Sequence, residues 1–451
     1  MDRRARIGWA VACAAASVLA TRGDLARAQA EPLDDVFVAI PLEPDDAPYR
    51  PETPRPAPPA TQPAAEPPVR GAPEGEQTDA VLSLRNDLVR PMTDVGITPA
   101  FSFTADYGKN LRGGASTNGS AFSHLIDLNF TFDTEKLLGL RGGSVFINFQ
   151  QQHGESASVD AGDFQDVSSI DAGGITQISE VWYEQKLWDE KLRVKVGKID
   201  AAGEFAYALN GGEFVNASMG WTATNAAIPT YPDPSFGGNV VVVPCKHFYA
   251  GAGLYDGAAQ EGVATGGRGP STLFGSPSDL YAIGEIGLTW DLHGQGMIGR
   301  LAGGTWRHTG TFEQFTGGTQ DGASGFYVTF DQTIVREHPG DESDAQGVGL
   351  FVIYDTADKD VFEIDHHLAA GVAWTGAIDG RNADVVGLGI SWVHFSDDAG
   401  FDSDSETAIE AFYRVQFTPY VSVKPDLQYI VNPSGSEDDA LVATIRLEAT
   451  F

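Results

Sequence analysis

A tryptophan flanked by charged residues at every second position is the feature of this 451-residue sequence with the clearest chemical content. Trp182 lies between Glu180 and Glu184, and Lys186 continues the same spacing. In a regular β-strand, side chains two positions apart point to the same face. A flat indole beside carboxylates offers an apolar surface for the C–H face of a sugar ring and acceptors for its hydroxyl groups. The alternative is that Trp182 belongs to an aromatic belt at a membrane interface.

Charged residues recur with the same spacing on other predicted strands. Arg193 and Lys195 should face the same side as the acids one strand earlier. Opposing charges across a water-filled channel steer solutes and screen ions. The alternative is that these charges form ordinary salt bridges that hold the wall of the channel. Lys198, Asp200 and Glu204 are expected at the pore mouth. The full set of candidate substrate-binding or pore-lining residues is Glu180, Trp182, Glu184, Lys186, Arg193, Lys195, Lys198, Asp200, Glu204, Glu410, Arg414, Lys424, Asp426, Gln428, Arg446 and Glu448.

Other motifs that could do chemistry are weak. His366 and His367 are adjacent, so on a strand they point to opposite faces and cannot bind one metal together. The acidic residues at 402–406 lack the glycine and the spacing of a calcium-binding loop. No Ser/His/Asp spacing suggests a catalytic site. The sequence therefore predicts no catalytic residue, no metal site and no cofactor.

The last strand indicates how the charged side chains are positioned. Ile445 and Leu447 alternate with Thr444, Arg446 and Glu448. Burying the last two in a soluble core would be costly. A transmembrane barrel instead places the apolar set against lipid and the polar set in the lumen. A soluble sandwich could also expose the polar face, so this strand alone leaves both folds open.

Period-2 alternation recurs along the chain, and the even number of such segments is typical of antiparallel closure. Long connections are expected at 154–176, 201–236, 256–280 and 309–324, and Pro425 predicts a bulge within its strand. The sequence thus predicts an all-β fold, a 16-stranded antiparallel transmembrane β-barrel, preceded by a short helix and a disordered Pro-rich segment. The predicted strands are 99–107, 124–133, 144–153, 177–187, 191–200, 237–243, 247–255, 281–291, 297–308, 325–335, 346–355, 366–376, 385–395, 407–417, 420–431 and 440–451.

Three segments precede the predicted barrel at 99–451. Residues 1–30 have a basic start, an apolar stretch and a small-residue cleavage pattern, which is typical of a signal peptide. Residues 31–78 contain 13 of the 25 prolines, which favours an extended periplasmic linker without a packed core. Residues 79–98 predict a short amphipathic lead-in helix.

Composition excludes several classes of protein. A formal net charge of −33 repels nucleic acid. Beyond the N-terminus no apolar run reaches 18 residues, so a membrane protein built from helices is not expected. Removal of residues 1–30 would leave Cys245 as the one cysteine, which excludes an intrachain disulfide.

Several blocks of sequence carry a resemblance to a known family. They are residues 180–185 with 192–201, residues 331–332 with 336–337, and residues 416–433, after a lead-in at 85–98. Over residues 80–451 the chain resembles the carbohydrate-selective porins typified by the OprB glucose porin. The resemblance implies a sixteen-stranded outer-membrane barrel, monomeric or trimeric, that takes up sugars passively without a cofactor.

We therefore expect an outer-membrane porin that lets small hydrophilic solutes, chiefly carbohydrates, diffuse into the periplasm, with export through the signal peptide. Its partners would be small sugars, outer-membrane lipid and lipopolysaccharide, and the barrel assembly machinery. Residues 31–78 could add a contact with the cell wall. The alternatives are a barrel enzyme of the outer membrane and a structural envelope tether.

Overall fold

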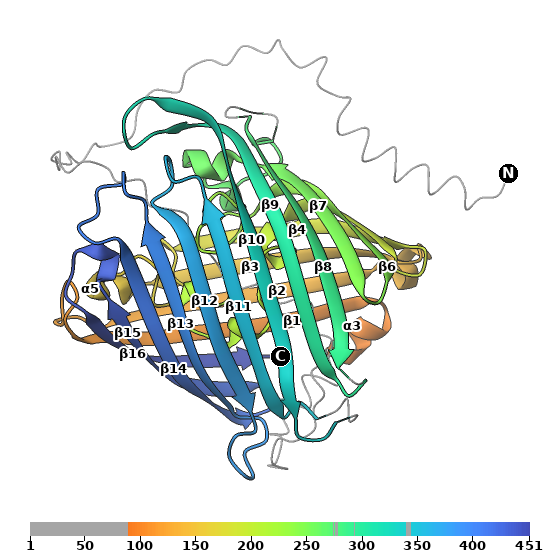
Figure 1. Cartoon of the computed structure of the whole chain (residues 1–451). Coiled ribbons are helices and arrows are strands. Elements are labelled where there is room, and N and C mark those ends of the chain that lie inside the picture. The colour runs from red at the N-terminus through yellow and green to blue at the C-terminus, as the bar shows by residue number, and fades with distance from the viewer. Residues whose placement is uncertain (1–88, 274, 276–277, 293, 340–343) are drawn as a thin grey trace, which may run out of the picture. The chain divides into compact units, whose positions relative to one another are not determined.

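The computed structural model describes residues 89–273, 275, 278–292, 294–339 and 344–451. Within these residues sixteen strands pair in sequence order, and β1 also pairs with β16, which closes one antiparallel barrel (Figure 1). The strands are β1 (Ile97–Arg112), β2 (Ala121–Asp133), β3 (Gly143–Gly154), β4 (Ile175–Leu187), β5 (Leu192–Ile199), β6 (Ser235–Cys245), β7 (Phe248–Asp256), β8 (Leu280–Leu292), β9 (Met297–Glu313), β10 (Thr319–Arg336), β11 (Gly347–Ala357), β12 (Ile364–Thr375), β13 (Val385–Phe395), β14 (Ser405–Thr418), β15 (Val421–Val431) and β16 (Ala440–Thr450).

The helices of the described residues are short and lie in connections or before β1. None of these described helices has the length and apolar character needed to cross a membrane. They are α3 (Arg90–Asp94), α4 (Thr134–Leu138), α5 (Ser158–Ala161) and the 3-10 helices η2 (Ala201–Gly203), η3 (Asn210–Glu213), η4 (Ala217–Met219), η5 (Ala258–Glu261), η6 (Thr265–Gly267) and η7 (Pro433–Gly435).

Alternation along each strand explains why the sheet closes with its polar residues inside. On β16, Ile445 and Leu447 expose 54% and 37% of their surface on the outer wall, whereas Arg446 exposes 4%. In a bilayer the exposed apolar side chains contact lipid, and no sheet edge is left without hydrogen-bond partners. The predicted sixteen-stranded barrel and the two faces of β16 are therefore confirmed.

Connections are short at one end of the barrel and longer at the other. The long ones used below are L2 (residues 155–174), L3 (residues 200–234) and L4 (residues 257–279). The long loop predicted at 309–324 is wrong, because β9 and β10 continue as a hairpin to Glu313 and Thr319 (Figure 1). This hairpin carries polar residues without the apolar alternation of a lipid-facing strand. The alternation used to predict strands therefore stops before β9 and β10 reach their ends.

Pro425 lies in β15 without a bulge. Its register with β16 is regular, with Pro425 opposite Ile445 and no shift on either side. On the β14 side the pairing stops after Phe412–Asp426 and resumes at Val415–Val423 with the same offset. The ladder is therefore interrupted beside the proline, which has no N–H to donate, and the strand keeps its register.

The predictions for residues 1–30 and 31–78 lie outside the described residues. Of the predicted lead-in helix at 79–98, the structure describes residues 89–98. There α3 covers Arg90–Asp94, with a proline in its first turn, and β1 already begins at Ile97.

Candidate functional site

Two of the long loops fold into the barrel and bind its inner wall. In L2, the backbone N–H groups of Phe164 and Gln165 donate to the Glu406 carboxylate at 2.8 and 3.0 Å. In L3, those of Val215 and Asn216 donate to the Glu410 carboxylate at 2.6 and 3.0 Å. A buried N–H group without an acceptor is costly, and a charged acceptor makes a strong bond. The two wall carboxylates therefore hold L2 and L3 inside the lumen.

The same arrangement recurs around L3. Further carboxylates on the inner wall each accept a backbone N–H of the loop, and together they hold it along most of its length. These bonds are Ala206 to Glu285 (3.0 Å), Asn210 to Asp331 (2.9 Å) and Thr224 to Asp355 (2.8 Å).

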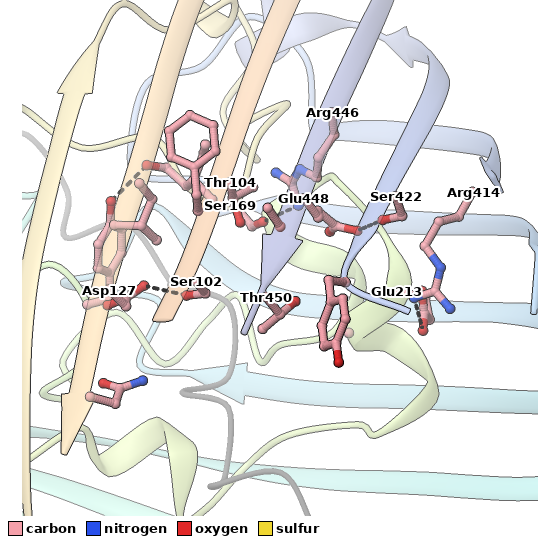
Figure 2. A pocket seen from close by; sticks show the side chains of 18 of the residues that line it. Ser102, Thr104, Asp127, Ser169, Glu213, Arg414, Ser422, Arg446, Glu448 and Thr450 are labelled. Carbon is pink, nitrogen blue, oxygen red and sulfur yellow. Dashed lines mark hydrogen bonds and ion pairs between the residues drawn. The ribbon is translucent and has the colours of Figure 1, made fainter. Parts of the chain in front are cut away.

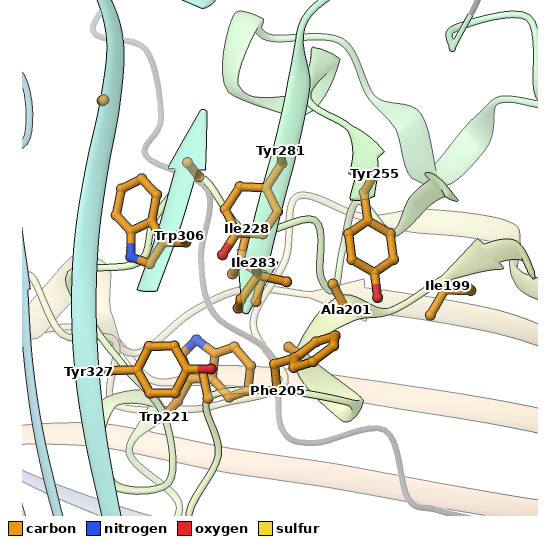
Figure 3. Close-up of a cluster of buried hydrophobic side chains, with 14 of the residues drawn as sticks. Ile199, Ala201, Phe205, Trp221, Ile228, Tyr255, Tyr281, Ile283, Trp306 and Tyr327 are labelled. Atoms are coloured by element: carbon orange, nitrogen blue, oxygen red, sulfur yellow. The ribbon is translucent and has the colours of Figure 1, made fainter. Parts of the chain in front are cut away.

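An apolar cluster fills the lumen on the β7–β10 side. Phe205 and Trp221 of L3 are both 1% exposed and pack in one cluster with inward aromatic side chains of the wall (Figure 3). Burying several aromatic side chains contributes a few kcal/mol each, at about 25 cal/mol per Å² of apolar surface. L3 therefore forms a packed plug against this side of the wall. The wall residues of the cluster include Tyr255, Tyr281, Ile283, Trp306 and Tyr327.

L2 is tied to the seam where the barrel closes. The guanidinium of Arg446 on β16 donates to both carboxylate oxygens of Asp106 on β1, at 2.8 and 2.7 Å. The hydroxyl of Ser168 in L2 donates to the same carboxylate at 2.6 Å, and Arg446 donates to Ser169 at 3.2 Å. One buried ion pair thus joins the first strand, the last strand and L2.

A cavity of about 700 Å³ remains between L2, L3 and the opposite wall (Figure 2). It extends from the short turns after β10, β12 and β14 to Ser169 and Ile170 of L2 and Glu213 and Tyr231 of L3. Its volume lies in the range of about 300–1,000 Å³ that is usual for small-molecule sites. The other lining residues used below are Ser102, Asp127, Asn129, Phe146, Asn148, Gln150, Glu180, Asp200, Asp344, Arg414, Ser422, Arg446 and Glu448.

Neighbouring polar side chains form a ladder on the β2–β3 wall of the cavity. The Asp127 carboxylate accepts hydrogen bonds from the amides of Asn148 and Gln150, both at 3.0 Å. Asn129 lies one inward position along β2, and Phe146 on β3, which is 6% exposed, contributes an aromatic side chain to the lining. The wall therefore combines hydrogen-bonding groups with an aromatic ring.

Acidic groups outnumber basic groups around the cavity. Asp127, Glu180, Asp200, Glu213, Asp344 and Glu448 face two bases, Arg414 and Arg446. Both bases are in ion pairs, Arg414 with Glu213 at 2.9 Å and Arg446 with Asp106 at 2.7 Å. Among the acids, Glu213 and Glu448 are paired as well, the latter with Lys424 at 3.4 Å, which leaves Asp127, Glu180, Asp200 and Asp344 without an ion pair to a lining base. Rings of carboxylates favour cations over anions in channels.

Asp200 is one of two acids of this set that lie in L3, the other being Glu213. Burial raises its pKa to about 6, although the hydroxyl of Thr230 and the backbone N–H of Tyr231 donate to its carboxylate at 2.8 and 3.3 Å. Its charge therefore changes near neutral pH. Glu180 is its close neighbour, because the Asp200 N–H donates to the Glu180 carboxylate at 3.1 Å.

Five of the predicted lining residues line this cavity. They are Glu180, Asp200, Arg414, Arg446 and Glu448. They come from β4, L3, β14 and β16, so the barrel brings together residues that are up to 268 positions apart in the printed sequence.

Trp182 faces the lumen but offers no open surface to a solute. It does not line the cavity, its ring stacks on Phe146 with centroids 4.9 Å apart, and the Lys195 ammonium lies 3.8 Å from the ring centre. Its N–H donates to Glu180 at 3.1 Å. This geometry does not support the predicted stacking of a sugar on Trp182, because neighbouring side chains already cover the ring. Phe146 lines the cavity instead.

The charges around Trp182 form a closed cluster. Arg193 lies 3.4 Å from Glu184 and 2.6 Å from Glu204, and Lys195 lies 3.6 Å from Glu184 and also pairs with Glu204. Glu204 belongs to L3, so these pairs hold the loop to the wall. Glu184, Arg193, Lys195 and Glu204 therefore form salt bridges that stabilise the wall. This was the alternative that the sequence left open, and it describes them better than a role in lining the pore.

The predicted residues of β14 and β15 face inward and bind loops as well. Lys424 donates to the Glu213 carbonyl at 2.8 Å, and Gln428 donates to the Val167 carbonyl at 2.8 Å and to Asp426 at 3.0 Å. With Glu410, described above, they lie behind L2 and L3 and do not line the cavity.

Lys198 and Lys186 lie elsewhere. Lys198 pairs with Val181, which is 37% exposed on the outer wall, and Val196, two residues before it, is 56% exposed on the same face. The prediction that Lys198 lines the pore mouth is therefore wrong, because strand alternation turns it outward. Lys186 is exposed near the end of β4 and pairs with Glu190 at 3.6 Å.

The sequence reasoning missed most of the polar ladder. Asp127, Asn129, Asn148 and Gln150 alternate regularly on β2 and β3, and that alternation was the available signal for their inward direction. No signal in the sequence marks Ser169 or Tyr231, which reach the cavity because their loops fold inward.

Histidines supply no metal site within the described part of the chain. His366 exposes 45% of its side chain and His367 none, as expected for adjacent residues on a strand. His367 is paired with Asp355 at 2.6 Å. Among the described residues, no group of three or more histidine, cysteine, aspartate or glutamate side chains is arranged to hold a metal.

Comparisons with known proteins agree with one another. Residues 117–451 match the family described as "Carbohydrate-selective porin, OprB family". Porin B of Pseudomonas aeruginosa is 24% identical over 398 residues, which cover 77% of this chain and 86% of that protein. The high-pH structure of Pseudomonas putida OprB is similar with a TM-score of 0.71 at 19% identity, covering 80% of this chain and 96% of that one. The low-pH structure gives a TM-score of 0.55 at 18% identity and covers 83% and 98%.

Proposed function

The chain belongs to the carbohydrate-selective porin, OprB family, and from this premise we propose that neutral sugars cross it through the cavity between L2, L3 and the β1–β4 and β14–β16 wall. It is an outer-membrane porin for the diffusion of sugars. The family membership favours a channel over the alternative of a barrel enzyme.

The observation that carries the proposal is the polar ladder beside an aromatic ring. Asp127, Asn148 and Gln150 present carboxylate and amide groups to the cavity, and Phe146 and Tyr231 lie in its lining. A sugar needs hydrogen-bond partners for its hydroxyls and an apolar surface for its C–H face. Side chains that only carried ions would not require the ring.

The excess of acidic groups supports selection of neutral and cationic solutes over anions. A phosphorylated sugar would meet more carboxylates than cations in the cavity, whereas a neutral sugar would not be repelled. We therefore expect neutral mono- and disaccharides to permeate faster than sugar phosphates of the same size.

The test is sugar block of ion current through the purified protein in planar bilayers. Phe146→Leu removes the flat ring and keeps an apolar side chain, and Asp127→Ala removes the acceptor at the centre of the ladder. Each should weaken block by about fivefold to tenfold, since one such contact is worth about 1 kcal/mol.

The matched control is Phe351→Leu. Phe351 is a lumenal phenylalanine, 1% exposed, that packs on Phe214 of L3 and does not line the cavity. Its sugar block should stay at the wild-type value. Equal block in all variants would remove the β2–β3 wall from the sugar path. Faster passage of sugar phosphates than of neutral sugars would contradict the proposed selectivity.

We also propose that residues 1–30 direct export and are removed. The N-terminal sequence of the mature protein should then start at Glu31. We further predict a monomer or a trimer, and contacts with lipopolysaccharide, the barrel assembly machinery and the cell wall.

Residues 31–78 are the candidate contact with the cell wall. Deletion of these residues should leave sugar flux intact and loosen the envelope if this segment acts as a tether.

A further inference from the structure

A crevice of about 730 Å³ lies against the outer wall of the barrel and shares only Gln150 with the lining of the cavity. Its floor is formed by outward apolar side chains of β2, β3 and β4, and its rim by residues 266–269 of L4. Leu128, Phe149 and Ile178 expose 37%, 43% and 46% of their surface there. L4 is one of the long loops, which lie on the extracellular side of an outer-membrane barrel. The crevice therefore lies at the extracellular end of a lipid-facing surface.

Two cations line this crevice. Lys198 is 4% exposed, and its ammonium donates to the carbonyls of Ile178, at 2.8 Å, and of Gly266. The Ile178 carbonyl lies where a register shift interrupts the β3–β4 ladder. An ammonium has three N–H donors, and these two bonds use two of them.

Arg268 is the second cation and is exposed on L4. Among the described residues, no hydrogen bond or ion pair to its guanidinium is found, so this group is available to a ligand. Asp233 lies beside this end of the crevice, because its carboxylate accepts the Gly266 N–H at 3.1 Å. Asp233 does not line the crevice.

Charge and position together identify what fits. The chain as a whole carries a formal charge of −33, whereas the ionisable residues that line this crevice are two cations, Lys198 and Arg268. A side chain on the outer wall contacts lipid, and basic groups at the boundary of a bilayer bind anionic headgroups. The phosphate-bearing lipid of the extracellular leaflet of an outer membrane is lipopolysaccharide.

We propose that this crevice binds the lipid A part of lipopolysaccharide, with one phosphate at Arg268 and Lys198 and an acyl chain along Leu128, Phe149 and Ile178. The apolar floor accounts for the chain and the two cations account for the phosphate. Binding at this site would also fix L4, because Arg268 and Gly266 belong to that loop.

The test is native mass spectrometry of the delipidated full-length protein, titrated with diphosphorylated lipid A. Wild-type protein should retain one tightly bound lipid. Arg268→Gln should weaken that binding about fivefold, because a basic residue near anionic lipid contributes about 1 kcal/mol. Lipid A without phosphates and phosphatidylglycerol should each bind the wild type more weakly than diphosphorylated lipid A.

Arg307→Gln is the matched control. Arg307 is an exposed arginine on β9, outside the crevice, and its substitution should leave lipid A binding unchanged. The proposal is overturned if both arginine variants weaken binding equally, if phosphate-free lipid A binds as tightly, or if cross-linking shows a second copy of the chain seated in the crevice. Sugar block of ion current should be the same in Arg268→Gln as in wild type, so this test is independent of the proposed sugar path.

Discussion

Substitution of Glu410 should release the middle of L3 from the barrel wall. The Glu410 carboxylate accepts the N–H groups of Val215 and Asn216 at 2.6 and 3.0 Å, and all three residues are buried. A hydrogen bond to a charged group contributes about 1.5–3 kcal/mol. Loss of both in Glu410→Ala therefore costs about 3 kcal/mol at the lower end of this range, which corresponds to roughly a hundredfold change in an equilibrium constant.

The direct assay is hydrogen exchange of the protein in detergent micelles. The amides of Val215 and Asn216 should exchange at least about a hundredfold faster in Glu410→Ala, because local opening governs exchange of buried amides. Gly212 and Glu213, which line the cavity, are close to them in sequence. We therefore also expect larger and noisier single-channel currents.

Asp127→Asn is the control for this prediction. The hydrogen bonds recorded for Asp127 come from side chains of the wall, namely Ser102, Asn148 and Gln150, so its substitution should leave exchange in L3 unchanged. Wild-type protection of Val215 and Asn216 in a folded Glu410→Ala barrel would refute the conclusion that wall carboxylates hold the loop in place.

Two further predictions follow from the buried charges. Arg446→Ala should destabilise the barrel by about 3–5 kcal/mol, because Asp106 is left buried without its partner. Denaturant unfolding in lipid vesicles measures this free energy. Replacement of both partners by apolar residues should restore much of the lost stability. Because burial raises the pKa of Asp200 to about 6, its negative charge is present above that pH and is lost below it. The preference for cations, measured as a reversal potential, should therefore fall between pH 7.5 and pH 5, and Asp200→Asn should lose this part of the pH dependence; an identical pH profile in that variant would contradict the assignment.

Some outcomes of the sequence reasoning can be traced to single residues. Trp182 faces the lumen as its spacing predicted, but its neighbours Phe146 and Lys195 lie on other strands and cover it. Lys198 is directed outward by the alternation in which Arg193 and Lys195 face inward, so its own parity on the strand already indicates its face. Parity on a strand therefore predicts which face a side chain takes, whereas contacts with other strands decide whether that side chain is open to solutes.

The strands and the closed barrel follow from the sequence by itself, because the direction of each side chain on a strand depends only on its parity. The face on which Arg446 lies can be predicted from the residues beside it on the same strand. Sixteen strands with one polar and one apolar face each are accommodated by a closed barrel with its polar faces inside. Only the tertiary structure decided that L2 and L3 enter the lumen and where the cavity remains. Those loops are held by contacts between Glu410 and Val215 or Glu406 and Gln165, which are 195 and 241 residues apart. The sequence around a wall carboxylate does not predict such partners, because the same alternation is found whether the carboxylate binds water, an arginine or the backbone of a distant loop.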